Sequence, residues 1–407
     1  MKCRFCQMQL DHVFLDLGSA PPSNAFLSKQ QLSEPEIYFP LKLFTCPECF
    51  LVQVDEVQNH TALFSDNYIY FSSFSKSWLA HAKHYADAAC KTLNLTCKSL
   101  VVEIASNDGY LLQYFQELQI PCIGIEPTAS TAHAARLKNI ETIERFFGRA
   151  FADELTADCG KADLIIGNNV LAHVPDINDF VSGVAAALKE DGVATFEFPH
   201  IMEMIANKQF DTVYHEHFSY LSFTTLQKIF AAHGLRLWDV ERLQTHGGSL
   251  RIWACLESSN RANTERVSEL QHVEQNAGIT NLDYYQKFQS YAESVKNQFL
   301  SFLIEQKKAG KSVAAYGAAA KGCTLLNYAG VKPDLLPYVI DASPHKQGKY
   351  LPGSRIPVLD ESALKANKPD FIIILPWNLK SEIIGQLDYV RAWGGKFVCA
   401  VPKLEIL

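Results

Sequence analysis

The sequence predicts an α/β protein in which a small cysteine-containing β module precedes two Rossmann-like units. Three observations favour this fold class. Two C-x-x-C pairs fall within the first 50 residues, short apolar segments alternate with helix-length ones from about residue 100, and a second such series begins near residue 311. The chain has 407 residues and is 48% apolar, which suits two to four domains at roughly 100–200 residues each.

Charge and apolar content exclude several classes of protein. The net charge of −7 does not indicate the broad basic surface that nucleic-acid binders carry, so we expect a small-molecule partner and no nucleic acid. Apolar runs such as Phe371 to Leu375 are too short to span a membrane, and the N-terminus lacks a signal-peptide pattern. We therefore expect a cytoplasmic protein without a membrane partner, in which 11 cysteines form no disulfide framework. The sequence leaves the oligomeric state open, a monomer included.

The first predicted unit, residues 1–70, carries four cysteines in two pairs. Alternating apolar runs around them indicate short strands with two knuckle turns. Two thiolates two residues apart hold one Zn²⁺, and a second pair closes a tetrahedral site, so we predict a structural zinc ion. Redox-active or incidental cysteines are the alternative. The predicted ligands are Cys3, Cys6, Cys46 and Cys49.

Residues 71–256 are predicted to form the first Rossmann-like unit. A helical pattern begins near residue 75, and alternating strands and helices follow it, which indicates βαβ connections and a parallel sheet. The predicted strands are 100–104, 121–125, 163–168, 193–198 and a late strand at 249–255, and the predicted helices are 109–118, 130–138 and 177–189.

Residues 257–308 are predicted to be a linker and a long helix, because apolar side chains from Tyr284 to Phe302 recur every three or four positions. This helix is expected to pack one domain onto another. Residues 309–407 are predicted to form the second Rossmann-like unit. Its predicted strands are 311–317, 335–341, 371–375 and 396–401.

A cofactor site is predicted where the first strand of the central unit ends. A turn of small residues lets the backbone approach a ligand, and an acidic residue about 20 positions later binds a ribose diol, as in sites for NAD or S-adenosylmethionine. The leading carboxylate and the single glycine favour the cationic methyl donor. An ordinary βα turn is the alternative. The candidate residues are Glu103, Ala105, Asn107, Gly109, Glu126, Asn168 and Asn169.

Residues 210–220 are too polar and aromatic for an ordinary core strand. If the segment from Tyr214 is extended, His215 and His217 share one face and Glu216 lies on the other, which disfavours a metal site. A general base is the preferred interpretation, because imidazole titrates near neutrality and a neighbouring tyrosine or histidine can stabilise an oxyanion. A structural hydrogen-bonded cluster is the alternative, and a bulge would exchange the two histidines.

Two further segments suit a polar substrate. Tyrosines and hydroxyl side chains at the first domain junction suit a polyhydroxylated ligand. In the last unit, a lysine after a glycine turn and two basic residues after the next strand can hold a phosphate. Solvated loop charges are the alternative. The candidates are Tyr68, Tyr70, Ser72, Lys321, His345 and Lys346.

Together these motifs resemble one family, the zinc-containing, S-adenosylmethionine-dependent C-methyltransferases that act on nucleotide-linked 4-keto deoxysugars. The resemblance covers nearly the whole chain. It rests on the cysteine pairs, E-x-x-S-N-D-G at 103–109, N-V-L-A-H-V-P-D at 169–176, Y-H-E-H at 214–217, G-G-S-L-R at 247–251 and the terminal G-x-x-x-K-G and S-P-x-K-Q-G runs. The wider methyltransferase pattern has glycine where Ala105 stands, so this loop must accommodate a methyl group there.

The resemblance implies a class I methyltransferase fold for the central unit and a nucleotide-sugar-binding role for the last one. It implies that the methyl donor is bound by Glu103, Asn107, Gly109 and Glu126. It implies that the sugar is bound by Tyr68, Tyr70, His173, Tyr214, Glu216 and His217, with His217 as the base.

The expected chemistry is C-methylation next to a ketone. A ketone at C4 acidifies the C3 proton, so a base can form an enolate if donors stabilise O4, and the enolate carbon then attacks the sulfonium methyl. We expect His217 as the base, Tyr214 and His173 as enolate stabilisers, and Glu216 as an orienting or charge-balancing group. The alternatives are an O- or N-methyltransferase on a sugar or other metabolite, a non-catalytic zinc-containing binding protein, and an RNA methyltransferase, which the acidic charge balance disfavours.

Overall fold

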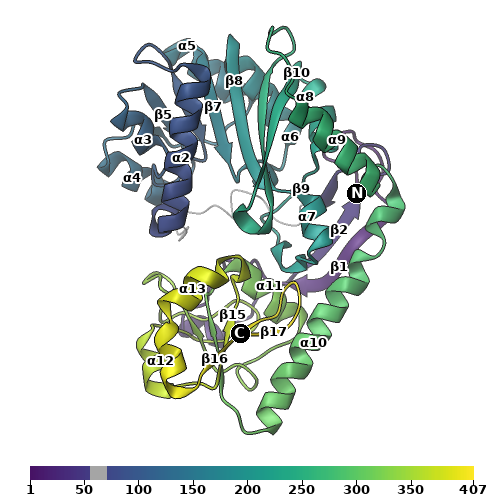
Figure 1. Cartoon of the computed structure of the whole chain (residues 1–407), viewed down its shortest axis with the longest axis vertical. Helices are drawn as coiled ribbons and strands as arrows, with labels where there is room; N and C mark the ends of the chain where they lie inside the picture. Colours follow the sequence, from purple (N-terminus) through teal and green to yellow (C-terminus); the bar gives the residue numbers. More distant parts are fainter. Residues whose placement is uncertain (56–70) are drawn as a thin grey trace.

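The computed structural model describes residues 1–55 and 71–407. Three sheets organise these residues, with strand orders β1-β2-β3-β9, β10-β11-β8-β7-β4-β5-β6 and β14-β13-β12-β15-β16-β17. The seven-stranded and six-stranded sheets lie at opposite ends of the molecule, and the long helix α10 and the ribbon β1–β2 connect them along one side (Figure 1).

The strands are β1 (His12–Ala20), β2 (Phe39–Thr45), β3 (Val52–Val54), β4 (Val101–Ile104), β5 (Cys122–Ile125), β6 (Thr142–Ile143), β7 (Ala162–Asn168), β8 (Leu188–Pro199), β9 (Ser219–Tyr220), β10 (Leu235–Leu243), β11 (Ser249–Leu256), β12 (Val313–Tyr316), β13 (Val339–Ile340), β14 (Val358–Leu359), β15 (Phe371–Ile374), β16 (Lys396–Cys399) and β17 (Glu405–Ile406). The α-helices are α2 (Lys76–Leu93), α3 (Leu112–Glu117), α4 (Ala129–Leu137), α5 (Arg149–Cys159), α6 (Ile177–Ala187), α7 (Ile201–Ala206), α8 (Phe223–Ala231), α9 (Glu265–Ala277), α10 (Phe288–Lys308), α11 (Ala320–Tyr328), α12 (Ser362–Asn367) and α13 (Lys380–Gln386). The 3₁₀ turns are η1 (Gln30–Ser33), η2 (Ser72–Phe74), η3 (Leu171–His173), η4 (Phe210–Thr212), η5 (Thr245–Gly247), η6 (Leu282–Tyr285), η7 (Trp377–Leu379) and η8 (Asp388–Trp393).

The N-terminal sheet contains a strand from the middle of the chain. The sequence predicts short strands around the cysteine pairs, and the structure has β1, β2 and β3 there as an antiparallel meander. β9 then pairs with β3, placing Tyr220 opposite Val52 and Ser219 opposite Gln53. The sequence did not indicate this fourth strand, because two residues are too few to show a period. The N-terminal module is therefore built partly from the segment that follows His217.

The N-terminal module is docked tightly on the seven-stranded unit. The Asn178 amide of α6 donates to the carbonyl oxygens of Arg4 and Phe5 at 3.2 and 2.9 Å, and the Thr225 hydroxyl of α8 donates to the Cys49 carbonyl at 3.0 Å. The buried cysteines belong to the same apolar cluster as one face of the seven-stranded sheet. The module thus shares a core with its neighbour.

The seven-stranded sheet contains the predicted strands and two more, β6 and β10. It is mixed, not wholly parallel as predicted, since β11 runs antiparallel to both of its neighbours. This strand order is that of the class I methyltransferase fold. α2 and α3 pack on one face of the sheet, whereas α5, α6 and α8 pack on the other. Hydroxyl and carboxylate caps begin several helices: Ser75 accepts from Trp78 N–H at α2, and Asp176 from Asp179 N–H at α6.

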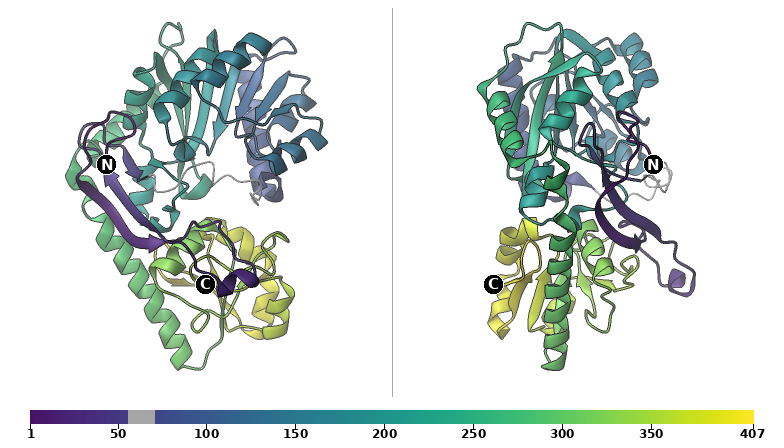
Figure 2. Two further views of the ribbon diagram at one scale, coloured as in Figure 1. Left: turned by 180° about the vertical axis from the view of Figure 1, so that it is seen from behind. Right: turned by 90° about the vertical axis from the view of Figure 1, so that its right-hand side faces the viewer.

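The predicted long helix is present as α10, and it joins the N-terminal module to the last unit. Its Phe288 ring stacks on Phe14 of β1 at 4.8 Å, and its Phe302 ring meets Phe371 of β15 edge-on at 5.4 Å. The predicted pattern began earlier, at Tyr284, which lies in the separate turn η6. Figure 2 shows α10 extending along the last unit, with its other end at the ribbon β1–β2.

The last unit contains the four predicted strands as β12, β13, β15 and β16, all parallel, with β14 and β17 added at the two edges. Their apolar side chains are buried on both faces, as expected of parallel strands. None of the described helices is long and apolar enough to cross a membrane.

Candidate active site and zinc centre

The four predicted zinc ligands come together at one point. Their sulfur atoms all lie within 4.8 Å of one another, and the Cys3–Cys49, Cys6–Cys46 and Cys6–Cys49 sulfur distances are 3.5, 3.4 and 3.7 Å. Zn–S bonds of about 2.3 Å in a tetrahedron require sulfurs about 3.8 Å apart, so the spacing fits Zn²⁺. All four positions are filled by thiolates, which makes the site structural.

The predicted cofactor loop has an unusual backbone. Ala105, Asn107 and Gly109 have φ values of +56°, +52° and +74°. The positive φ of Gly109 favours glycine, and a methyl group there would lie 2.4 Å from Ile140 Cδ1, so that side chain would have to move. Ala105 adopts the left-handed conformation with its side chain present, which explains why the wider pattern has glycine there. The loop turns sharply and exposes main-chain groups at the end of β4.

Two buried carboxylates flank this loop. Glu126, after β5, accepts the N–H groups of Asn107 and Thr128, both at 2.9 Å, and the side chains of Thr128 and Thr131 also hydrogen-bond to it. Burial raises the pKa of Glu126, and burial raises the pKa of Glu103 well above its ordinary value against the opposing hydrogen bond of Tyr110. A cationic ligand next to Glu103 would favour its ionised form.

The end of β7 offers further polar atoms to a ligand. The Oδ1 atoms of Asn168 and Asn169 are buried, and no hydrogen-bond partner for them is found among the described residues. Asn169 has φ of +56° and donates its N–H to the Glu197 carbonyl at 2.7 Å. Buried orphan acceptors beside the glycine turn fit a ligand that carries an amine and hydroxyls, as S-adenosylmethionine does.

The segment predicted to carry the base is not a strand. Residues 213–218 form a turn between η4 and β9, so the expected alternation of faces is wrong. His215 turns away to the N-terminal module, with Nε2 3.3 and 3.2 Å from the carbonyl oxygens of Phe39 and Pro40. His217 instead lies against His173, with ring centroids 4.7 Å apart. Long-range contacts, not a strand period, decide where each side chain points.

The hydrogen bonds of His217 define its tautomer. Nδ1 lies 3.0 Å from the Thr212 carbonyl, which can only accept, so Nδ1 carries the proton. Nε2 therefore holds the lone pair and accepts from the Tyr214 hydroxyl at 2.7 Å. The His217 ring is half-buried. Desolvation by the surrounding protein lowers the pKa of His217 well below the ordinary value, and the neighbouring His173 lowers it further. His217 is a neutral imidazole at pH 7 with its basic nitrogen next to a phenol.

Neighbouring groups around His217 are also perturbed. Burial lowers the pKa of His173 to about 4, against a hydrogen bond to the Glu216 carbonyl. Burial raises the pKa of the Glu216 side chain to about 7, against a hydrogen bond from Asn24. Such shifts cluster where proton transfer takes place, as well as in structural networks.

The last unit contacts residues 210–217, called the base loop from here on, from the other side. Trp377 donates its indole N–H to Asp211 at 2.8 Å, and the Thr324 hydroxyl donates to the Val213 carbonyl at 2.7 Å. Lys321, at the start of α11, lies over the Trp377 ring at 4.4 Å and donates to Asn378 at 3.1 Å. Burial lowers the pKa of Lys321 to about 8, against the charge of Asp211.

The remaining candidate substrate residues are dispersed. The Ser72 main-chain N–H donates to Asn107 Oδ1 at 2.9 Å, so Ser72 supports the cofactor loop. His345 is exposed and stacks on Phe71 at 5.7 Å. The Lys346 ammonium donates to the Ala318 carbonyl at 2.9 Å and lies 3.7 Å from Asp341. A phosphate bound there would share this ammonium with both groups. Tyr68 and Tyr70 lie outside the described residues.

A buried charge cluster that the sequence did not predict lies at the end of β8. The Glu197 carboxylate is fully buried and is bound by His81, Thr245 and Arg251 at 2.8, 2.8 and 2.7 Å. Burial opposes its ionisation, yet the His81 hydrogen bond and the Arg251 charge lower the pKa of Glu197 to about 2. The G-G-S-L-R motif contained Arg251, but nothing in the sequence pointed to its carboxylate partner.

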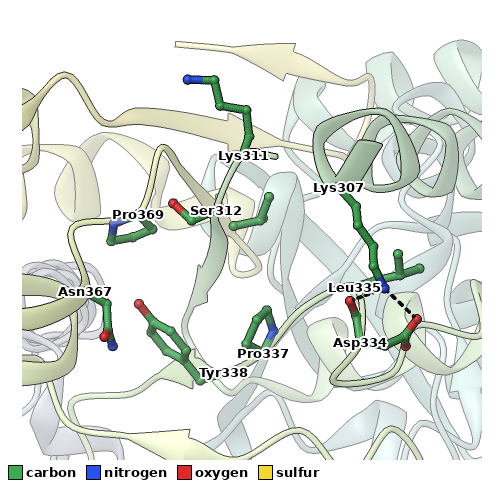
Figure 3. A pocket seen from close by; sticks show the side chains of 10 residues that line it. Lys307, Lys311, Ser312, Asp334, Leu335, Pro337, Tyr338, Asn367 and Pro369 are labelled. Atoms are coloured by element: carbon green, nitrogen blue, oxygen red, sulfur yellow. Dashed lines mark hydrogen bonds and ion pairs between the residues drawn. The ribbon is translucent and has the colours of Figure 1, made fainter. Parts of the chain in front are cut away.

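A separate pocket of about 150 Å³ lies in the last unit at the amino ends of β12, β13 and β15 (Figure 3). Its lining includes Tyr338 and Asn367, and its Lys307 is already bound to Asp334. Ligands of open α/β sheets bind at the carboxyl ends of the strands, which here face the base loop. This pocket is therefore not the predicted substrate site.

Comparisons with known proteins agree with the fold and the zinc centre. Family models match for a zinc binding domain at residues 3–64, a methyltransferase domain at 80–240 and a C-methyltransferase C-terminal domain at 244–402. C-methyltransferase NovU of Streptomyces niveus is 32% identical over 406 residues, covering 100% of this chain and 96% of NovU.

Other matches concern the central unit. A ubiquinone biosynthesis O-methyltransferase of Rhodopseudomonas palustris is 29% identical over 114 residues, or 26% of this chain and 45% of that protein. The structure of magnesium protoporphyrin IX methyltransferase (ChlM) from Synechocystis PCC 6803 with bound SAM is 15% identical and covers 44% of this chain and 80% of that one, with a TM-score of 0.33.

The fold, the four-cysteine centre and the family matches define the class of protein: a zinc-containing methyltransferase that uses S-adenosylmethionine. Because NovU matches over the full length of the chain, this protein belongs to the S-adenosylmethionine-dependent C-methyltransferase family.

Proposed function

We propose that this enzyme methylates C3 of a nucleoside-diphosphate-linked 4-keto-deoxysugar through an enolate, with His217 as the general base. The single observation that carries the proposal is the hydrogen-bonding of His217. Its Nδ1 proton is bound to the Thr212 carbonyl at 3.0 Å, and its Nε2 lone pair lies 2.7 Å from the Tyr214 hydroxyl. A neutral imidazole with a phenol beside it can remove a proton and stabilise the resulting oxyanion.

In this scheme the Tyr214 hydroxyl donates to one of two acceptors, Nε2 of His217 or O4 of the sugar. Without substrate its hydroxyl covers Nε2 of His217. When a ketone oxygen is presented, the hydroxyl can turn to O4, which frees Nε2 to take the C3 proton. His173, 4.7 Å from His217, is the second candidate donor for O4.

The His217 surroundings limit where the sugar lies. A cavity of about 20 Å³ borders His217, Ser219 and Tyr220, which is room for about one water and too small for a sugar. We place the sugar on the opposite side, between the base loop and the cofactor loop. S-adenosylmethionine supplies a methyl group on a cationic sulfur, and Glu103, Asn107, Gly109, Glu126, Asn168 and Asn169 would hold it.

We assign the diphosphate to the last unit, where Lys321, His345 and Lys346 lie. Lys321 adjoins the base loop, since its charge acts on His217. A substrate held by this lysine would therefore be anchored next to the catalytic base.

The test is a mass-spectrometric methyl-transfer assay in D₂O with S-adenosylmethionine and a panel of nucleotide-linked 4-keto-6-deoxysugars. We expect a gain of one methyl group, and deuterium exchange at C3 when the methyl donor is omitted. Protein that binds the methyl donor but neither methylates nor exchanges any member of a broad panel would contradict the proposal and favour an O- or N-methyltransferase.

A further inference from the structure

The N-terminal zinc module places one polar side chain on the base loop. Asn24 follows β1, 192 positions before Glu216, and its Nδ2 atom lies 2.8 and 2.9 Å from the two Glu216 carboxylate oxygens. Glu216 is 3% exposed. A carboxylate removed from water depends on such a donor, because an unpaired buried charge is strongly unfavourable.

The segment that carries Asn24 is fixed at both ends. β1 precedes it, and Leu27 pairs with Tyr350 of the last unit through main-chain bonds of 2.9 and 2.8 Å. Between these anchors, the Phe26 ring lies 5.6 Å from the Lys346 ammonium. Figure 2 shows this N-terminal segment reaching across to the last unit. Asn24 therefore stands between the base loop and the part of the protein assigned to the nucleotide.

We propose that Asn24 is a positioning residue of the active site, which orients the Glu216 carboxylate and thereby the loop that carries His217. The inference rests on the proposed function and deepens it. It gives the zinc module a part in the reaction beyond its contribution to folding.

The groups around Glu216 come from four parts of the chain. His215 and His217 lie on its own loop, His173 of η3 bonds to its main-chain carbonyl, and the charge of Glu216 acts on the Cys323 thiol of α11. Lys346 and Glu36 act on that same thiol. Among these groups, the Asn24 amide opposes the effect of burial on the carboxylate directly.

The Asn24 bond predicts a pH effect with a definite sign. The hydrogen bond lowers the pKa of Glu216, which burial has raised to about 7. Removing the donor must raise it further, so the ionised form is reached only at higher pH. A rise of about one unit means about tenfold less ionised Glu216 at pH 6.

The experiment compares Asn24→Ala and Asn24→Asp with the matched control Asn178→Ala. Asn24→Asp keeps the side-chain volume, so it covers the case in which Asn24→Ala fails to fold. Asn178→Ala removes an asparagine that docks the same module through bonds to the Arg4 and Phe5 carbonyls, and none of its hydrogen bonds with the described residues involves Glu216. The readouts are kcat and KM against pH, and the ¹³C-carboxyl titration of Glu216, assigned by its absence in Glu216→Gln.

We expect both Asn24 variants to move the acid limb of kcat and the Glu216 titration upward by about one unit, Asn24→Asp more than Asn24→Ala. The KM for the sugar should stay within about twofold, and kcat should recover at pH 9. Asn178→Ala should lower stability without moving either midpoint. An unchanged Glu216 titration in both Asn24 variants, or an equal shift in Asn178→Ala, would overturn the inference.

The titration also separates this inference from the proposed function. It needs no turnover, so it reports on Asn24 even if no keto sugar is methylated. If no member of the panel is methylated but the Glu216 titration shifts, the result counts against the proposed substrate class and not against the role of Asn24. If the sugar is methylated but the titration does not shift, the result counts against the role of Asn24 alone.

Discussion

The cofactor loop at 103–109 is held by its own unit, whereas the base loop at 210–217 is held by every part of the molecule. Glu126 and Ser72, both in the central unit, bond to the cofactor loop. The base loop is bonded to the N-terminal module, to η3 and to the last unit through separate contacts. Under the proposed assignment, a cofactor shared by many enzymes would be bound by local contacts, and the proton transfer would depend on assembly of the whole chain.

This difference predicts that changes in the two loops will be separable. Damage to the base loop or to its supports should lower the rate of proton transfer while the affinity for S-adenosylmethionine is kept. Damage to the cofactor loop should first affect local stability and that affinity.

The largest effect is expected from His217→Ala. Loss of the base should lower both methyl transfer and C3 exchange by about 10²–10⁴-fold. Calorimetric affinity for S-adenosylmethionine should be unchanged. His215→Ala is the matched control, because His215 bonds to main-chain carbonyls of the N-terminal module and should lose stability with kcat retained. The reverse order of the two variants would assign the base to His215.

Zinc removal should come next. The knuckle that ends at Cys49 leads into β3, and β3 pairs with β9 immediately after His217. A displacement of roughly 1 Å at a catalytic group costs about 10²-fold, so we expect a loss of that order in kcat with much smaller change in methyl-donor affinity. Metal content and calorimetry check this. Full kcat in protein shown to be metal-free would break the proposed link between module and base.

The difference in stability between Glu216→Gln and the wild type should depend on pH. The folded-state pKa of about 7 lies above the ordinary 4.5, so the unfolded state ionises more readily, and the wild type loses stability as pH rises from about 4.5 to 7. Glutamine removes that loss. We expect the variant to be more stable by on the order of 2–3 kcal/mol at pH 8 and nearly equal below pH 4.5, measured by urea unfolding.

Glu197→Gln is a control for that measurement, because its expected change in stability has the opposite sign. The pKa of Glu197 is lowered to about 2, so its ionised form stabilises the fold above about pH 4.5 and this contribution is lost as pH falls through 2. The Gln variant should be less stable than the wild type at pH 7. A loss of stability at pH 8 in both variants would contradict the assigned burial cost at Glu216.

The smallest effects are expected in the cofactor loop. Gly109→Ala adds a methyl group 2.4 Å from Ile140 Cδ1 at a φ of +74°, and should cost about 1–3 kcal/mol. Ala105→Gly relieves a left-handed residue at +56° and should be neutral or stabilising by up to about 1 kcal/mol. Unfolding midpoints and methyl-donor affinity check both. Strong destabilisation by Ala105→Gly would show that its methyl group packs productively.

Sequence alone determined the features that are encoded over short distances. The two cysteine pairs, the strands β4, β5 and β7, the turn ending in Gly109 and the aromatic stripe of α10 all have local spacing that reflects their burial or their ligand. The mixed direction of the sheet was missed, because a strand has the same period whichever way it runs.

Tertiary structure decided the base site. Residues 213–218 form a turn that is held by bonds to its side chains and main-chain carbonyls. The partners are Asn24, Phe39, Pro40 and Thr324, each more than 100 positions away in the sequence. Local periodicity reports which residues are buried and is silent on what they meet. Asn24, Trp377 and the β3–β9 pairing could therefore be recognised only in the folded chain, where they hold a neutral histidine next to a phenol.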